Sequence, residues 1–215
     1  MAEPPTERTR VRRLPERGAY DRATIDAILD EALICHLAYV LDDGPRITPT
    51  IHARVGDTLY VHGSNASRTL RTAKEGTPVA VEVTLLDGLV IARSAFHHSM
   101  NYRSVVVHGR AREVTDPTEK WEAQRALVEH VVHGRAADAR MPNDRELKQT
   151  TILAIPLEES SAKIRTGPPK DEEEDYALPV WAGVLPLRTV PGDPEPDPLL
   201  PDGISAPSYL HEYRR

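Results

Sequence analysis

The chain has 215 residues, a formal net charge of −6 and a sequence pI near 5.9. This length suits one domain with a sizeable core, and the acidic balance argues against a nucleic-acid binder driven by bulk charge. No apolar stretch is long enough to span a membrane or to form the core of a signal peptide, so a cytoplasmic protein without nucleic-acid or membrane partners is expected.

The first third of the chain predicts an arm, a helix and three strands. Residues 1–19 place three prolines among charges and are expected to be extended. Asp21 is expected to cap a helix over residues 22–32, with Ile25, Ile28, Leu29 and Leu33 on one face. Strands separated by Gly- and Asp-rich turn sequences are predicted over residues 35–41, 46–55 and 58–62.

Cys35 is the single cysteine of the chain, which excludes an intrachain disulfide. It lies in an apolar run, where a buried thiol is usually inert. We therefore expect a core residue rather than a nucleophile.

Residues 58–74, TLYVHGSNASRTLRTAK, join a short strand to a turn and a basic helical pattern. Arg68, Arg71 and Lys74 recur at spacings of three, so they would lie along one side of a helix. The first turn of a helix presents unpaired N–H groups and the positive end of the dipole. Together with the turn hydroxyls, these groups can bind a phosphate. The alternative is a hairpin turn followed by an amphipathic helix with a solvated basic face.

The second half of the chain predicts further strands and one long helix. A hairpin is expected across Asp87-Gly88, and Gly109 is expected to form a bulge. Asp116 and Pro117 are expected to start a helix whose apolar stripe is Trp121, Leu127, Val128 and Val131. Strands are predicted over residues 78–86, 89–94 and 102–114, and residues 150–156 and 161–165 are two further strand candidates.

The last forty or so residues are rich in proline, which excludes a regular helix or a central strand. The acidic run 171–175 is expected to be solvated, and the tail either wraps the domain or is partly disordered. Six to seven short, mostly antiparallel strands with inserted helices indicate a mainly β protein built as a small barrel. Since no GxGxxG or GxxxxGK[ST] motif occurs, the phosphate site is not of the Rossmann or P-loop type.

Three segments together suggest a family: the second strand, the turn His62-Gly-Ser-Asn-Ala-Ser-Arg68, and residues 96–106, FHHSMNYRSVV. They resemble the pyridoxamine 5′-phosphate oxidase-like proteins, in particular the flavin-nucleotide-binding group that includes nitroimidazole-resistance proteins. The resemblance covers residues 20–165 and 179–187. It implies an FMN-binding split β-barrel over residues 20–166, between the extended arm (1–19) and the acidic, Pro-rich tail (167–215) that the composition predicts. It also implies a homodimer with two FMN molecules at its interface, each contacted by both chains.

The resemblance assigns the phosphate end of FMN to one turn. Ser67 and Arg68 match the Ser-Arg pair that contacts the phosphate, and Ser64 and His62 lie beside them. The next position is often Lys in the family but is Thr69 here, and Arg71 or Lys74 would replace the missing cation.

The resemblance also places Thr48, Pro49 and Thr50 on the strand that runs along the isoalloxazine edge. The oxidase carries an Arg and a Lys on this strand, where Thr48 and Thr50 stand here. Its Arg-rich C-terminal signature also has no clear counterpart in this tail. Both departures argue against oxidation of vitamin B6 itself.

His97 and His98 are candidate catalytic residues. If they are adjacent on a strand, they point to opposite faces, which disfavours a shared metal or haem site. One of them is expected to line the substrate side of the flavin and donate a hydrogen bond or a proton; the alternative is a polar turn. His52 and His62 are expected near the cofactor or as ordinary satisfied histidines, with the site role favoured for His62.

Later segments supply further candidates. Tyr102, also a catalytic candidate, and Ser104 share one strand face and would meet the cofactor, where Tyr102 can stack or donate its hydroxyl. Trp181 would cap the flavin from the tail or pack on the barrel. Lys163 and Arg165 would form a rim that reaches an anionic cofactor or substrate.

These predictions favour an FMN-dependent oxidoreductase that moves electrons between a nicotinamide donor and a small-molecule substrate, with the redox chemistry carried by the flavin. Two alternatives stay open. One is a flavin-binding carrier or sensor without turnover, and the other is use of F420 or haem by the same fold.

Overall fold

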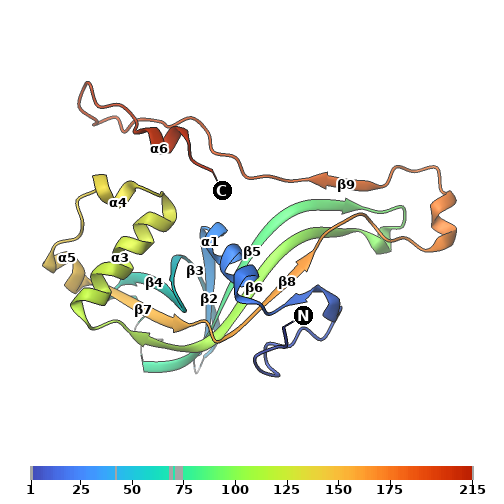
Figure 1. Ribbon diagram of the computed structural model, residues 1–215, viewed down its shortest axis with the longest axis horizontal. Coiled ribbons are helices and arrows are strands. Elements are labelled where there is room, and N and C mark those ends of the chain that lie inside the picture. The colour runs from blue at the N-terminus through green and yellow to red at the C-terminus, as the bar shows by residue number, and fades with distance from the viewer. Residues whose placement is uncertain (1, 42, 68–69, 71–74, 215) are drawn as a thin grey trace.

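A computed structural model describes residues 2–41, 43–67, 70 and 75–214 (Figure 1). Its helical segments are α1 (Arg22–Glu31), α3 (Pro117–Val131), α4 (Arg135–Asp138), α5 (Asp144–Gln149), α6 (Ser208–His211) and the 3-10 turns η1 (Pro15–Arg17), η2 (Ala95–His97) and η3 (Glu173–Ala177). Its strands are β1 (Gly18–Ala19), β2 (Ile34–Leu41), β3 (Gly44–Val55), β4 (Thr58–Ser64), β5 (Glu75–Ile91), β6 (Ser99–Glu113), β7 (Thr150–Pro156), β8 (Glu159–Arg165) and β9 (Gly183–Pro186).

The strands form one antiparallel sheet that closes on itself. Their order is β1-β8-β6-β7-β4-β3-β2-β5-β9, and a further pairing of β5 with β6 closes a ring through β6, β7, β4, β3, β2 and β5. The prediction of a mainly β split barrel with helices is confirmed. The sheet has more strands than expected, because the N-terminal segment adds β1 beside β8 and the tail adds β9 beside β5.

The hairpin predicted across Asp87-Gly88 is wrong. β5 runs continuously past this point and pairs with β6, with a bulge between Leu86 and Gly88. The Asp87 carboxylate accepts hydrogen bonds of 3.0 and 2.8 Å from Arg103 on β6. A Cβ at Gly88 would lie 3.0 Å from the Leu185 carbonyl oxygen of β9. The dipeptide therefore serves a bulge and the close approach of an edge strand rather than a chain reversal.

The bulge predicted at Gly109 is also wrong, because this residue pairs in register with Val79. A glycine is needed at this position for a different physical reason. A Cβ there would lie 3.3 Å from the Ile155 side chain and 3.5 Å from that of Pro156, so the end of β7 passes close to β6.

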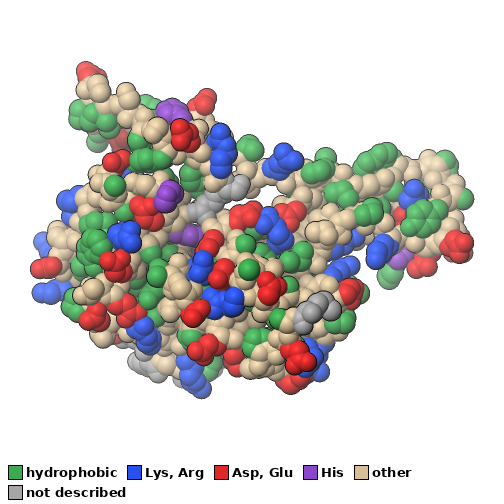
Figure 2. Space-filling view, in the orientation of Figure 1, with side chains coloured by type: hydrophobic (Ala, Val, Ile, Leu, Met, Phe, Trp, Pro, Cys, Tyr) green, Lys and Arg blue, Asp and Glu red, His purple; other side chains and the backbone are tan. Residues whose placement is uncertain are grey.

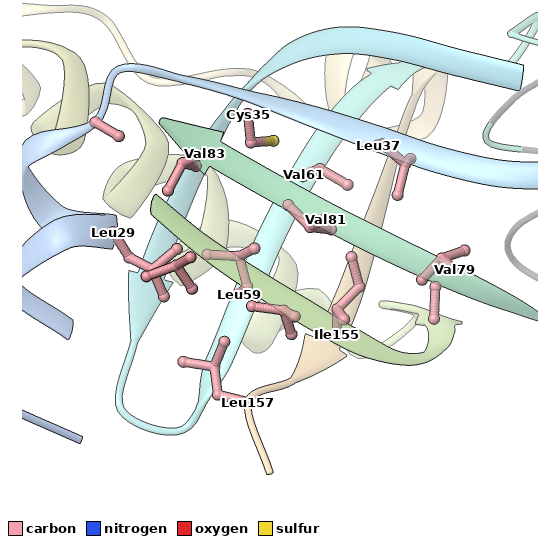
Figure 3. Close-up of a cluster of buried hydrophobic side chains, with 14 of the residues drawn as sticks. Leu29, Cys35, Leu37, Leu59, Val61, Val79, Val81, Val83, Ile155 and Leu157 are labelled. Atoms are coloured by element: carbon pink, nitrogen blue, oxygen red, sulfur yellow. The ribbon is translucent and has the colours of Figure 1, made fainter. Parts of the chain in front are cut away.

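The core fills the ring and extends under α1. Asp21 caps α1 by accepting a 2.9 Å hydrogen bond from the Thr24 N–H, as predicted. Ile25, Ile28 and Leu29 are buried, whereas Leu33 lies beyond the helix end and is exposed. Alternate side chains of the strands, and Leu157 just after β7, meet these residues inside the barrel (Figure 3). The strand residues are Cys35, Leu37, Leu59, Val61, Val79, Val81, Val83 and Ile155.

The long helix α3 packs against β3 and β4. Asp116 caps it by accepting a 2.8 Å hydrogen bond from Glu119 N–H. Its buried residues are Ala123 and Leu127, whereas Trp121, predicted for the apolar stripe, is exposed. Within the described ranges, no helix is both long and apolar enough to cross a membrane.

The tail is extended and attached at several points (Figure 1). Asp171, expected in a solvated acidic run, instead has its side chain shielded from solvent, and its carboxylate accepts hydrogen bonds from the backbone N–H groups of Arg93 and Ser94. After β9, the chain passes back toward α3 and α4, where the Tyr209 hydroxyl donates to Asp138 at 2.7 Å. On the face shown in Figure 2, acidic and basic side chains are interspersed.

Cys35 is expected to be inert. Its thiol is buried inside the barrel, and this burial raises its pKa to about 12. The thiol therefore stays protonated at pH 8, and we expect no reaction with Ellman's reagent in the native protein. Full reaction is expected after unfolding in guanidinium, and rapid labelling of the native protein would contradict this assignment.

Candidate functional site

The barrel splits between β3 and β4. The two strands pair from His52 to Val55 on β3 and from Thr58 to Val61 on β4. Beyond this point β3 pairs with β2, while the last residues of β4, from His62 to Ser64, pair with β7. In the part of the chain that the structure describes, residues 44–47 and 49–51 of β3 have no strand partner on the β4 side. Their backbone N–H and C=O groups there can therefore hydrogen-bond to a ligand.

The predicted strand residues lie along this edge. Thr48 and Thr50 are half-buried and pair with Leu37 and Cys35 of β2, while Pro49 points to the exposed outer face. Proline is compatible with a strand that has one unpaired edge, because it has no N–H to contribute to a ladder. Their predicted contacts with a flavin ring stay predictions.

The turn after β4 is held by backbone and side-chain hydrogen bonds. The Ser64 carbonyl accepts from the Ser67 N–H at 2.8 Å, and the Ser64 hydroxyl oxygen accepts from the Ala66 N–H at 3.1 Å. Asn65 anchors the turn to the barrel: its side-chain amide donates to the Lys148 carbonyl at 2.5 Å and accepts from the Thr151 hydroxyl at 2.6 Å. Asn65 was not among the predicted site residues, although its position in the turn sequence signals a structural role.

The Ser67 side chain contacts the backbone of Leu70. Its hydroxyl oxygen accepts a 3.4 Å hydrogen bond from the Leu70 N–H, as an N-cap does. Leu70 is buried in the barrel core and approaches Gly63 so closely that a Cβ there would lie 2.7 Å from its Cδ1. These contacts fix where the turn leaves the barrel. Arg68, Thr69, Arg71 and Lys74, with the basic helix predicted from them, lie outside the described residues.

His62 stands where the two strands separate. It is half-buried, and burial lowers the pKa of its imidazole, so the ring is neutral at pH 7. Its Nδ1 is buried, and it neither donates a hydrogen bond to a described residue nor accepts one from it. A neutral imidazole can serve as donor or acceptor toward a ligand. His52, by contrast, is fully buried with Nε2 2.9 Å from the Leu29 carbonyl oxygen, which is a structural position.

The other predicted residues lie where β5 and β6 extend beyond the ring, with β8 and β9 at the sides (Figure 1). We call this extension of the sheet the arm; it is distinct from the N-terminal residues 1–19. Tyr102 pairs with Leu86 and Arg165, and the Ser104 hydroxyl donates to the Lys163 carbonyl at 3.2 Å. Ten residues of strand, about 33 Å, separate Tyr102 from Arg112, where β6 meets β7. A single chain therefore does not bring Tyr102 beside the β4 turn. Trp181, just before β9, is exposed.

His97 and His98 are not on a strand, so the argument that they point to opposite faces does not apply, and their location matches the alternative of a polar turn. They belong to the η2 turn, and both line one cavity at the far end of the arm. His97 Nε2 lies 3.4 Å from a Glu172 carboxylate oxygen, and His98 Nδ1 lies 3.0 Å from the Ser94 carbonyl oxygen.

A cavity of about 670 Å³ lies between the outer face of the sheet and the tail; we name it the tail cavity. In Figure 2 the tail passes over the sheet with a hollow beneath it. Apolar side chains of β2, β5 and the tail line the cavity, among them Ile34, Leu86, Leu187 and Val190, together with the predicted residue Pro49.

The tail cavity holds one imidazole and several charges. His36 lines it, and its Nδ1 lies 3.4 Å from a Glu82 carboxylate oxygen. Arg103 is neutralised by Glu31 and Asp87, and these bonds raise the pKa of its guanidinium. Arg188 and Arg214 also line the cavity. Sequence reasoning missed His36, although its outward position between Cys35 and Leu37 follows from strand alternation.

The sequence profile described as pyridoxamine 5′-phosphate oxidase matches residues 21–164, two thirds of the chain. The chain belongs to this family. The resemblance predicted from the sequence is therefore confirmed, and the barrel has the flavin-binding fold of pyridoxamine 5′-phosphate oxidase-like proteins. No protein with a curated description matches the chain.

Among solved structures, two are similar to nearly the whole chain, and a third shares its fold at lower identity. The flavocytochrome Anf3 from Azotobacter vinelandii is 39% identical, with 99% of both chains covered and a TM-score of 0.93. An FAD- and haem-binding protein from Mycobacterium smegmatis is 37% identical over 91% of this chain and 96% of its own, with a TM-score of 0.87. A 5-nitroimidazole resistance protein from Bacteroides thetaiotaomicron shares the fold at 20% identity, with coverage of 68% and 86% and a TM-score of 0.58.

Proposed function

We propose that the chain binds a flavin nucleotide in the split between β3 and β4. The observation that carries this proposal is the separation of β3 from β4 before His52, beside the turn in which the Ser67 hydroxyl oxygen accepts from the Leu70 N–H. The edge offers backbone groups to the isoalloxazine ring, and the turn offers N–H groups and the predicted Arg68 to the phosphate. FMN is the predicted cofactor, and the FMN moiety is also part of FAD, which is named for the similar mycobacterial protein.

A second group, haem, fits the tail cavity. Its apolar walls suit a porphyrin, and Arg188 and Arg214 suit the propionates. Glu82 beside His36 Nδ1 would orient the ring and leave Nε2 to bind iron, as carboxylates do behind metal-bound histidines. The two similar proteins named as a flavocytochrome and as an FAD- and haem-binding protein support this assignment.

The proposed activity is that of an oxidoreductase that accepts electrons from a nicotinamide donor and delivers them to a small-molecule acceptor. When bound, flavin and haem supply two-electron and one-electron chemistry respectively. The residues described here would bind, orient and shield these groups from water. Thr48 and Thr50, in place of the basic residues of the oxidase, argue against vitamin B6 as substrate. A carrier or sensor without turnover is the alternative.

The proposed active form is a homodimer. The outer face of β2 and β3 exposes a row of apolar residues paired across the two strands: Ile34 with Ile51, Ala38 with Ile47 and Val40 with Pro45. An exposed apolar sheet face of this kind is typical of a protein interface. Since Tyr102 lies far from the β4 turn of its own chain, both can contribute to one flavin only if a second copy supplies one of them.

The absorption spectrum of the purified protein tests the proposed function. Flavin bands and a Soret band are expected, and chromatography of the flavin released by acid identifies it as FMN or FAD. A colourless protein that binds neither added flavin contradicts the proposal. Anaerobic bleaching by NADH or NADPH, followed by reoxidation with an acceptor, separates an enzyme from a carrier.

Replacing Arg68 with alanine is expected to weaken flavin binding. A charge-assisted hydrogen bond to phosphate contributes about 1.5–3 kcal/mol, so the affinity should fall roughly ten- to a hundredfold. Quenching of flavin fluorescence on titration measures this. Arg125→Ala on the exposed face of α3 is the matched control. Equal affinity of the two variants would remove Arg68 from the phosphate site.

A further inference from the structure

A second cavity lies at the far end of the arm, apart from the split and the tail cavity. Its volume is about 550 Å³, and its walls come from η1 and the residues before it, from η2, and from the end of β8 and the residues after it. We name it the arm cavity. Its polar lining includes four cations and two imidazoles: Arg13, Arg17, His97, His98, Arg165 and Lys170.

The charged side chains that line the arm cavity are predominantly positive. Of the described residues that line it, Glu16 alone carries a carboxylate. Of the nearby acidic residues, Asp171 forms an ion pair with Arg93, and a carboxylate oxygen of Glu172 lies close to the His97 ring. Across residues 2–41, 43–67, 70 and 75–214, no ion pair involves any of the four cations. Like charges held together without a counter-ion repel one another, so the cavity favours an anion.

Arg165 is the buried centre of this charge. It is 7% exposed, and its guanidinium donates to the Asn101 side-chain oxygen and to the carbonyls of Gly167 and Pro168, the last two at 3.3 Å. All three acceptors are neutral. Burial, followed by the charge of Arg17, lowers the pKa of Arg165. A buried charge without a counter-ion is costly, and a bound anion would offset that cost.

An exposed aromatic ring stands at the same cavity. Phe96 is 88% exposed, lines the cavity and packs edge-on against His97, with ring centroids 5.1 Å apart. Its exposed face is accessible to a flat ligand that enters the cavity. An exposed ring beside a basic cavity matches the needs of a nucleotide, because the base stacks on the ring while the cations hold the phosphates.

We propose that the arm cavity binds the phosphates of a nucleotide, with Arg13, Arg17 and Arg165 as ligands of the phosphate oxygens and Phe96 as the platform for the base. Guanidinium groups bind phosphate with paired hydrogen bonds, and a cavity of this size accepts more than an inorganic ion. The same chemistry fits the ADP half of FAD and a separate nucleotide such as NADPH. This site goes beyond the proposed flavin and haem sites.

Calorimetric titration of the full chain, freed of flavin, with ADP and with inorganic pyrophosphate tests the site. Both are expected to bind, and Arg13→Gln/Arg17→Gln should weaken both by about tenfold or more, since two charge-assisted contacts are lost. Phe96→Ala should weaken ADP but not pyrophosphate. Lys120→Gln/Arg125→Gln on α3 removes the same charge elsewhere and should leave both affinities unchanged.

Two further titrations identify the source of the nucleotide. If Arg13→Gln/Arg17→Gln weakens FAD but not FMN, the arm cavity holds the ADP half of the flavin. If it weakens NADPH and leaves both flavins unchanged, the cavity serves the electron donor. The inference is overturned if the unmodified chain binds neither ADP nor pyrophosphate, or if the α3 control loses as much affinity as the arm variant. Since the first titrations need no flavin, they are independent of the proposed flavin site.

Discussion

His36→Ala is expected to abolish the Soret band of the protein while its flavin bands remain. Among the described residues that line the tail cavity, His36 carries the only imidazole, and its Nδ1 lies 3.4 Å from a Glu82 carboxylate oxygen. Removal of an axial histidine takes away the bond from protein to iron, which apolar walls do not replace. The flavin is proposed to lie at the split between β3 and β4, so its binding should be unchanged.

The measurement is a titration of the haem-free variant with haemin, followed at the Soret band. His133→Ala is the matched control, because His133 also lies beside a glutamate, Glu129, but is fully exposed and outside the tail cavity. The control should bind haem as the unmodified chain does. An unchanged Soret band in His36→Ala would remove this residue as the iron ligand. Loss of the band in both variants would point to a general effect on the fold.

Glu82→Gln refines this test. The amide keeps the size of the side chain but removes the charge that would orient the His36 ring. We expect haem to bind more weakly, by roughly ten- to a hundredfold, with the Soret band retained. A structural role in the sheet alone would leave haem affinity unchanged, because Glu82 pairs with His36 and Val106 through its backbone in either variant.

The elements that depend on neighbouring residues in the chain could be predicted. The cap at Asp21, the strands around Cys35 and Thr150 and the turn at Ser67 follow from local patterns, and the structure places them within a few residues of the expected bounds. The split barrel itself followed from the resemblance and is confirmed by the ring that β5 and β6 close.

The predictions that were wrong concern features determined by contacts between residues distant in sequence. Asp87-Gly88 has the local chemistry of a turn, but Arg103 on the next strand and the tail strand β9 determine its bulge. Asp171 has the sequence context of a solvated acid, yet its side chain is shielded from solvent and accepts a hydrogen bond from the backbone of Arg93. The tail cavity could not be predicted for the same reason. His36 and Val190 lie more than 150 residues apart in the chain, and only the path of the tail brings them to one cavity.

Ile47→Asp is expected to convert the proposed dimer to a monomer. Ile47 is 68% exposed in the single chain and stands opposite Ala38 in the middle of the apolar face of β2 and β3. If a second copy covers this face, a carboxylate there would be buried without a partner, which costs several kcal/mol. The dissociation constant of the dimer should rise by roughly a hundredfold or more. Light scattering coupled to size-exclusion chromatography measures the change.

The control for this variant is Leu199→Asp. Leu199 is 90% exposed in the tail and outside the apolar face, so the same added charge should leave the oligomeric state unchanged. Unchanged mass for Ile47→Asp would exclude this face as the dimer interface. A monomer that keeps full flavin affinity would show that one chain completes the flavin site. If the monomer loses flavin as well, residues of two chains form the site, and Tyr102 on the arm becomes the first candidate for the contribution of the second copy.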